Sequence, residues 1–133
     1  MIKIRPVLSL IIFCTFFIAC KSPLTKENLV GKWKYLKIEN TDIRSTHFVT
    51  TEELEAESPY IQFSKNDSML IWWGGKVLSH GSYKVDGDNI RIKEILEDGK
   101  TRDFPFVVSK LDDKNLVFET KGDDGAKVTA VKQ

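Results

Sequence analysis

From residue 60 onward, the order of hydrophobic and polar residues predicts strands. Alternation with period two is clearest over 89–93 and 104–108, and the segments 116–118 and 128–131 are also rich in β-forming residues. Turn chemistry recurs at intervals of 9 to 14 residues, near Asn66, Gly75, Gly87, Gly99, Asp113 and Asp124. Such spacing is typical of successive antiparallel strands joined by short links.

Three further elements are predicted in the first part of the chain. The segment 29–38 has the character of a strand, and Thr25 can cap a single helical turn directly before it. In the long connection that follows, Thr50 and Glu53 form a capping box that predicts a short acidic helix before Pro59. The strand around Trp33 brings the expected number of strands to eight.

Eight consecutive antiparallel strands can hide their edges by closing on themselves. The expected fold class is therefore all-β: a small eight-stranded antiparallel up-and-down β-barrel, with a short helical turn before the first strand. A sandwich of two sheets is the competing architecture.

Composition limits the classes of function. The chain has 133 residues, 41% hydrophobic and 29% charged, which allows one domain. Its 20 Lys and Arg residues balance 19 Asp and Glu residues, so no electrostatic basis exists for binding nucleic acid. We expect a monomer that needs no cofactor.

The N-terminus has the pattern of a secretory signal. Lys3 and Arg5 precede fourteen uncharged positions, from Pro6 to Ala19. A membrane-spanning helix needs about 20 apolar residues, so this segment is short for that role.

The segment Phe17-Ile18-Ala19-Cys20 resembles the lipobox of bacterial lipoproteins. The resemblance implies that Cys20 is diacylated, with acyl chains such as palmitate, and becomes the first residue of the mature protein. The expected organisation is then a signal peptide over 1–19, a lipidated tether and helical turn over 20–28, and the barrel over 29–133. An ordinary cleaved signal followed by an incidental Cys20 is the alternative.

The residues around the lipidation site also bear on location. Lys21 stands where an Asp would resemble an inner-membrane retention signal, which favours the outer membrane. No acidic cluster resembling a surface-export tag follows in 21–24, so we expect the periplasmic side. Removal of 1–19 also removes Cys14, and a lipidated Cys20 leaves the barrel without a thiol for disulfide, metal or nucleophilic chemistry.

Gly31-Lys32-Trp33, behind a one-turn helix, resembles the G-x-W signature of lipocalins and of the shorter lipocalin-like domains of Bacteroidetes lipoproteins. The resemblance implies that Trp33 packs across the closed end of the barrel beneath a basic residue from near the last strand. Lys132 is the candidate for that residue, through a cation–π contact. Gly31 would allow close approach of the backbone at this closed end of the barrel.

Alternation along the strands nominates inward-facing side chains. Ile92 is one candidate for the core, and the candidates for ligand binding are Tyr35, Phe63, Ile71, Trp73, Tyr83, Phe106 and Phe118. The adjacent Trp72 and Trp73 cannot both enter one core without a bulge. Continuing the alternation of Met69 and Ile71 places Trp73 inside and Trp72 outside, whereas the opposite register reverses them.

Two functions follow from this interior. The first is a membrane-anchored lipoprotein that binds a small apolar or amphipathic ligand in the barrel mouth. The alternative is a filled barrel that acts as a protein-interaction or inhibitor module in the cell envelope, through the outward tryptophan. Eight-stranded barrels lie at the size where either interior is feasible.

Catalytic and metal-binding patterns are weak. His47 and His80 lack the partner spacing of a metal site and are expected at the surface. Ser79 and His80 are neighbours on opposite faces of a strand, a poor geometry for a nucleophile and its base. We therefore expect a protein that is not an enzyme.

Overall fold

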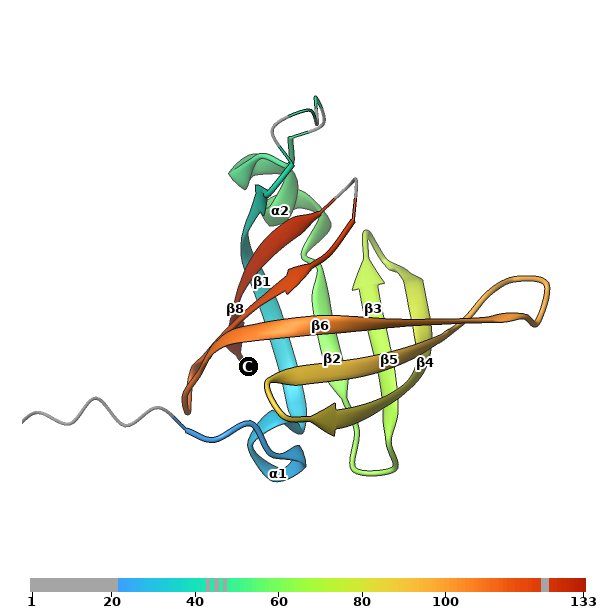
Figure 1. Ribbon diagram of the computed structural model, residues 1–133. Coiled ribbons are helices and arrows are strands. Elements are labelled where there is room, and N and C mark those ends of the chain that lie inside the picture. Colours follow the sequence, from blue (N-terminus) through green and yellow to red (C-terminus); the bar gives the residue numbers. More distant parts are fainter. Residues whose placement is uncertain (1–21, 43, 45, 47, 123–124) are drawn as a thin grey trace, which may run out of the picture.

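The chain forms a barrel of eight strands with two short helices in a computed structural model, which describes residues 22–42, 44, 46, 48–122 and 125–133 (Figure 1). The elements in chain order are α1 (Lys26–Leu29), β1 (Gly31–Asn40), α2 (Thr51–Glu57), β2 (Tyr60–Phe63), β3 (Ser68–Trp73), β4 (Lys76–Asp86), β5 (Asn89–Ile95), β6 (Thr101–Leu111), β7 (Asn115–Thr120) and β8 (Ala126–Lys132). The N-terminal segment 1–21, including Cys20, lies outside the described residues, as does His47.

Each strand pairs in antiparallel fashion with the next, and β8 returns to pair with β1. The closing register runs from Trp33 opposite Lys132 to Asn40 opposite Ala126. Because every strand has two neighbours, no edge is left unpaired. The predicted up-and-down barrel is confirmed, and the two-sheet sandwich is excluded.

Both predicted helix starts are confirmed by their caps. The Thr25 hydroxyl oxygen accepts the Asn28 backbone N–H at 3.2 Å, and the Thr50 hydroxyl oxygen accepts that of Glu53 at 3.1 Å. These bonds satisfy amide groups that a first helical turn leaves without partners. Leu29 is a correction: it ends α1 and is fully buried, so the strand expected over 29–38 begins only at Gly31.

Five of the six predicted turns join consecutive strands, near Asn66, Gly75, Gly87, Gly99 and Asp113. The sixth, near Asp124, lies outside the described residues. His80 is exposed in β4, as predicted.

The connections define two ends of the barrel. The α1 helix and the β2–β3, β4–β5 and β6–β7 turns gather at one end, which we call the closed end (Figure 1). The α2 helix and the β3–β4 and β5–β6 turns lie at the opposite, open end.

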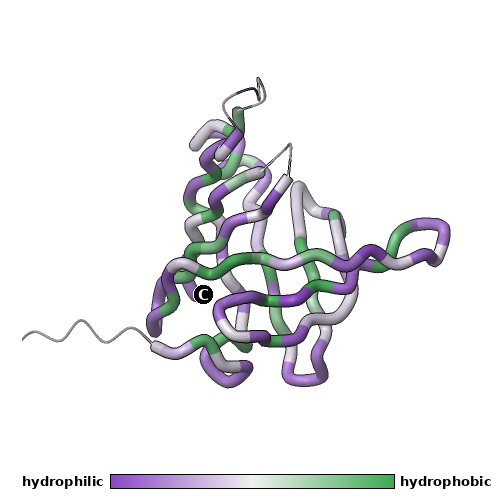
Figure 2. The backbone as a smooth tube through the Cα atoms, viewed as in Figure 1, coloured by the Kyte–Doolittle hydropathy of each residue, from purple (hydrophilic) through white to green (hydrophobic). Residues whose placement is uncertain are grey.

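The closed half of the barrel is filled with side chains. Apolar and polar residues alternate along the strands (Figure 2), which directs alternate side chains to the interior. The largest side chains with almost no exposed surface are Trp33, Phe63, Phe118, Leu29, Ile61, Met69, Ile90, Ile92 and Leu116. The open half is different, because a cavity takes the place of part of this packing there.

Candidate ligand-binding site

A cavity of about 550 Å³ opens into the barrel at its open end. This volume falls within the range of small-molecule sites in proteins. Its wall has an aromatic part, which we call the aromatic floor, formed by Tyr35, Phe104, Phe106 and Phe118. The barrel is therefore filled in one half and hollow in the other. A cavity in one half differs from the wholly filled interior of the alternative function, whose protein partner stays a prediction.

The aromatic floor is a continuous set of ring contacts from three strands. The Phe106 and Phe118 centroids are 4.7 Å apart, and those of Phe104 and Phe106 are 5.4 Å apart. Tyr35 meets Phe118 edge to face, with centroids 6.2 Å apart and an angle of 65° between the rings. Aromatic pairs favour such tilted arrangements because ring edges are positive and faces negative. The floor thus holds its shape without a ligand.

Tyr35 supplies the polar group on this floor. Its side chain is buried, and its hydroxyl makes no hydrogen bond to any other residue that the structure describes. Burial raises the pKa of the Tyr35 phenol well above its usual value, so the hydroxyl keeps its proton at neutral pH. A neutral phenol can donate one hydrogen bond and accept others.

The cavity wall also carries a small polar network. Glu94 of β5 accepts a hydrogen bond from the Ser79 hydroxyl of β4 through Oε2. Its Oε1 lies 2.8 Å from Nη2 of Arg102 on β6. The Arg102 guanidinium also lies over the Phe104 ring, 5.1 Å from its centroid. Three neighbouring strands therefore place one ion pair at the rim of an aromatic cavity.

The structure brings together four of the seven residues predicted to bind ligand: Tyr35, Ile71, Phe106 and Phe118 line the cavity. The other three do not line it. Phe63 and Tyr83 pack against each other in the closed half, with centroids 4.9 Å apart, and the Tyr83 hydroxyl donates to the Ser64 carbonyl at 2.8 Å. Trp73 packs against the core outside the cavity wall.

Of the two registers considered for the adjacent tryptophans, the structure has the one that continues the alternation of Met69 and Ile71. Trp73 packs on the barrel core, whereas Trp72 stacks on Tyr60 with centroids 6.0 Å apart and an angle of 14° between the rings. Tyr60 alternates with the buried Ile61 and therefore belongs to the outer face. Lys32 lies over the other side of this pair, with its Nζ 4.0 Å from the Tyr60 centroid. The outer indole is thus half-buried by its own neighbours.

Glu94 and Arg102 were absent from the predicted site, although a signal for them existed. Glu94 continues the alternation of the buried Ile90 and Ile92, and Arg102 continues that of Phe104 and Phe106. Both charges therefore fall on the inward face. Their pairing needs the β5–β6 register, in which the two residues lie opposite each other.

The closed end is sealed by the residues of the Gly31-Lys32-Trp33 segment. Trp33 is fully buried, and its indole N–H donates to the Leu29 carbonyl at 2.8 Å. Lys132 places its Nζ 5.4 Å from the Trp33 ring centroid, the predicted cation–π contact. Gly31 has φ +143°, a backbone conformation that favours glycine, and a Cβ there would lie 3.0 Å from Cε of the flexible Lys132 side chain.

Two searches within the described residues returned nothing. They contain no group of three or more His, Cys, Asp or Glu side chains arranged to hold a metal ion. None of their helices has the length and apolar character needed to cross a membrane.

Comparison with solved structures identifies similar barrels. A lipocalin-like protein from Bacteroides uniformis superposes with a TM-score of 0.56 at 20% identity, over 80% of this chain and 99% of that one. An uncharacterized protein from Bacteroides eggerthii gives a TM-score of 0.55 at 20% identity, over 79% and 99% of the two chains. Neither protein-family models nor curated proteins match the sequence. At this level of identity the likeness concerns the fold, and the fold of this chain is lipocalin-like.

Proposed function

We propose that the barrel binds a small apolar or amphipathic molecule in the cavity at its open end. The observation that carries the proposal is the hollow of about 550 Å³, walled by the aromatic floor beside the Tyr35 hydroxyl, which makes no hydrogen bond within the described residues. Burying apolar ligand surface against these rings contributes about 25 cal/mol per Å², before the costs of association are subtracted. A binding function without catalysis fits the lipocalin-like fold, although fold alone decides no activity.

The proposal includes a lipid anchor on Cys20 after removal of the segment 1–19. Support comes from the lipobox-like sequence and from the position of Ser22, whose backbone N–H donates to the Leu111 carbonyl at 3.1 Å. Leu111 ends β6 at the closed end of the barrel. Two residues reach at most about 7 Å, so an anchor on Cys20 holds the closed end next to the bilayer.

This arrangement turns the cavity away from the anchoring membrane. A ligand then enters the cavity from water, through the open end, and its apolar surface is buried inside the barrel. We place the protein on the outer membrane, on its periplasmic side, because Lys21 and the residues after it lack the acidic signals described above.

Binding is tested with N-phenyl-1-naphthylamine, a neutral probe that fluoresces in apolar sites. The protein should raise its fluorescence, and Val128→Phe, which fills the cavity wall, should weaken binding at least about tenfold. Thr129→Phe on the outer face of the same strand is the matched control and should bind as the unmodified chain does. Equal binding by both variants, or no binding by the unmodified chain, contradicts the proposal.

The anchor is tested separately by expressing the full chain in a bacterial host that processes lipoproteins. Mass spectrometry should find a mature protein that begins at Cys20 and carries acyl chains. Cys20→Ser should yield a protein without acyl mass that leaves the membrane fraction. A protein cleaved elsewhere, or one without acyl mass, rejects the anchor and leaves the cavity proposal intact.

A further inference from the structure

We propose that the cavity selects amphipathic ligands with an anionic head group, carboxylate or phosphate, which Arg102 binds at the rim while the apolar tail lies on the aromatic floor. This inference rests on the proposed function, because it concerns ligands of the same cavity. It assigns Arg102 as the residue that determines specificity.

Arg102 lies at the boundary between the apolar wall and water. It is the second residue of β6, next to the open end, and its side chain is 63% exposed. Two strand positions further along, Phe104 lies beneath the guanidinium. A ligand whose tail contacts Phe104 and Phe106 would therefore carry its head group next to this cation.

Within the network of Ser79, Glu94 and Arg102, the remaining hydrogen-bonding capacity belongs to Arg102. Glu94 has a side chain only 13% exposed, and each of its carboxylate oxygens already has a partner, the Ser79 hydroxyl and the Arg102 guanidinium. A guanidinium carries five N–H donors, and Arg102 uses one of its nitrogens on Glu94 within the described residues. The Glu94–Arg102 pair has no net charge, so what the network offers an anion is the spare N–H donors of the guanidinium.

Glu94 also holds Arg102 in place. The ion pair and the Phe104 ring fix the guanidinium in two directions, so a ligand need not order the side chain on binding. The planar fork of arginine can bind carboxylates along different edges at once. A ligand anion can therefore join Glu94 on Arg102 without displacing it.

Two other charged residues, Asp103 and Lys121, also line the cavity, although strand alternation puts both on the outer face. Asp103 alternates with Arg102 and Phe104 along β6 and lies opposite the exposed Lys93. Lys121 pairs with Glu119, with 3.5 Å between Nζ and Oε2, and Glu119 alternates with the buried Phe118. The exposed Lys93, which is not part of the cavity wall, makes the matched control: a cation on the outer face of β5 next to Glu94.

The experiment measures displacement of N-phenyl-1-naphthylamine by four ligands with one tail: dodecanoate, dodecyl phosphate, dodecanol and dodecylammonium. For the unmodified chain, at least one of the two anions should bind about fivefold more tightly than dodecanol, and dodecylammonium should bind more weakly than dodecanol. The tighter of dodecanoate and dodecyl phosphate identifies the head group. Arg102→Gln should lower anion affinity to that of dodecanol, while Arg102→Lys keeps part of the preference and Lys93→Gln keeps all of it.

The outcomes separate this inference from the proposed function. Unchanged dodecanol affinity in Arg102→Gln shows that the variant still folds and keeps its cavity. Equal affinities for all four ligands in the unmodified chain, a preference for dodecylammonium, or an anion preference that survives Arg102→Gln overturns the inference while leaving ligand binding in place. If neither the probe nor any of the four ligands binds, the proposed function itself fails.

Discussion

Lys132, at the end of the last strand, holds its Nζ 5.4 Å from the ring centroid of Trp33 in the first strand. The two residues lie directly opposite each other where β8 pairs with β1. The same pair of residues therefore takes part in closing the barrel, through the β1–β8 pairing, and in covering its closed end. Both depend on segments about 100 residues apart in the chain.

Weakening this seal should destabilise the barrel. Trp33→Phe removes the indole N–H bond to Leu29 and leaves a void in a fully buried site, so we expect a loss of about 2–3 kcal/mol. Lys132→Met removes the cation–π contact at a cost of about 0.5–1 kcal/mol. Urea unfolding measures both, with Lys84→Met at an exposed site as the control. An effect of Lys132→Met no larger than that of the control would show that the contact contributes nothing.

The two inward tyrosines should respond differently to loss of their hydroxyls. Tyr83→Phe removes the hydrogen bond to the Ser64 carbonyl and should cost about 1 kcal/mol. Tyr35→Phe removes a hydroxyl that has no bond within the described residues, so its effect on stability should be within about 0.5 kcal/mol. Thermal and urea unfolding of the two variants measure the change in the free energy of unfolding for each. Equal losses would mean that the Tyr35 hydroxyl has a structural bond after all.

Gly81 should tolerate no side chain. A Cβ at this position of β4 would overlap the Lys93 carbonyl oxygen of the paired strand β5. Gly81→Ala should therefore force the two strands apart and cost about 1–3 kcal/mol, or prevent folding. The exposed neighbour gives the control, since Ser82→Ala should change stability by no more than about 0.5 kcal/mol. A stable Gly81→Ala protein with an unchanged urea midpoint would contradict this account of the strand pair.

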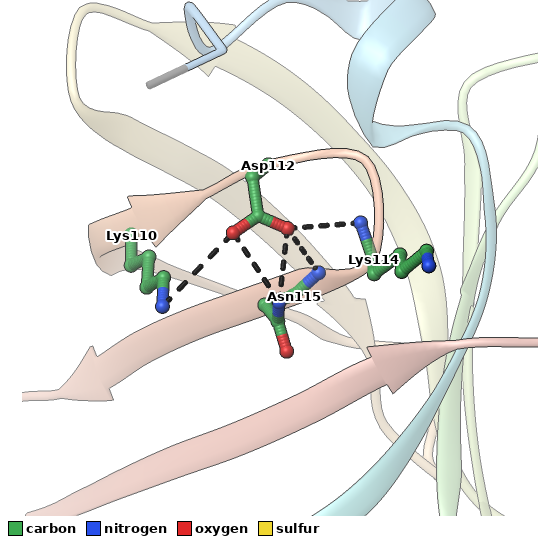
Figure 3. A network of polar contacts seen from close by, with 4 residues as sticks. All are labelled: Lys110, Asp112, Lys114 and Asn115. Atoms are coloured by element: carbon green, nitrogen blue, oxygen red, sulfur yellow. Dashed lines mark hydrogen bonds and ion pairs between the residues drawn. The ribbon is translucent and has the colours of Figure 1, made fainter. Parts of the chain in front are cut away.

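Asp112 should make stability depend on pH in the acid range. Its Oδ1 accepts the backbone N–H groups of Lys114 and Asn115 at 2.9 and 2.8 Å, and Lys110 lies 4.0 Å away (Figure 3). The hydrogen bond from the Lys114 backbone, followed by those from Asn115 and the charge of Lys110, holds the pKa of Asp112 below its usual value of 3.8, against the opposing effect of burial.

The sign of the effect follows from linkage. A carboxyl group with a lower pKa in the folded state stabilises the protein above its unfolded pKa, and that contribution disappears as the pH falls through the folded pKa. The free energy of unfolding should therefore be higher for the unmodified chain than for Asp112→Ala at pH 6, and the difference should shrink below about pH 3.8. Asp113→Ala, at the exposed next residue, is the control. A difference that stays constant down to pH 2 would refute the assignment.

The sequence could not predict how far along the barrel axis an inward side chain lies. Alternation decides which face a residue occupies, and it correctly placed Phe63, Tyr83 and Phe118 inside. It does not decide whether an inward residue fills the closed half or lines the hollow half. That depends on strand register and on the tilt of strands in a closed barrel, which the pairing of distant segments establishes.

The ion pair of the cavity was likewise a tertiary result. Glu94 and Arg102 belong to different strands, and only the register across the β5–β6 turn sets them opposite each other, where the Ser79 hydroxyl completes the network. The sequence by itself determined the strands, their turns and the helix caps, because these follow from local backbone preference and period-two alternation. Of the two registers that alternation allowed for Trp72 and Trp73, the structure selected the one with Trp73 on the core. Only the tertiary structure decided where the barrel is hollow and which charge faces that hollow, because both depend on side chains from strands far apart in the chain.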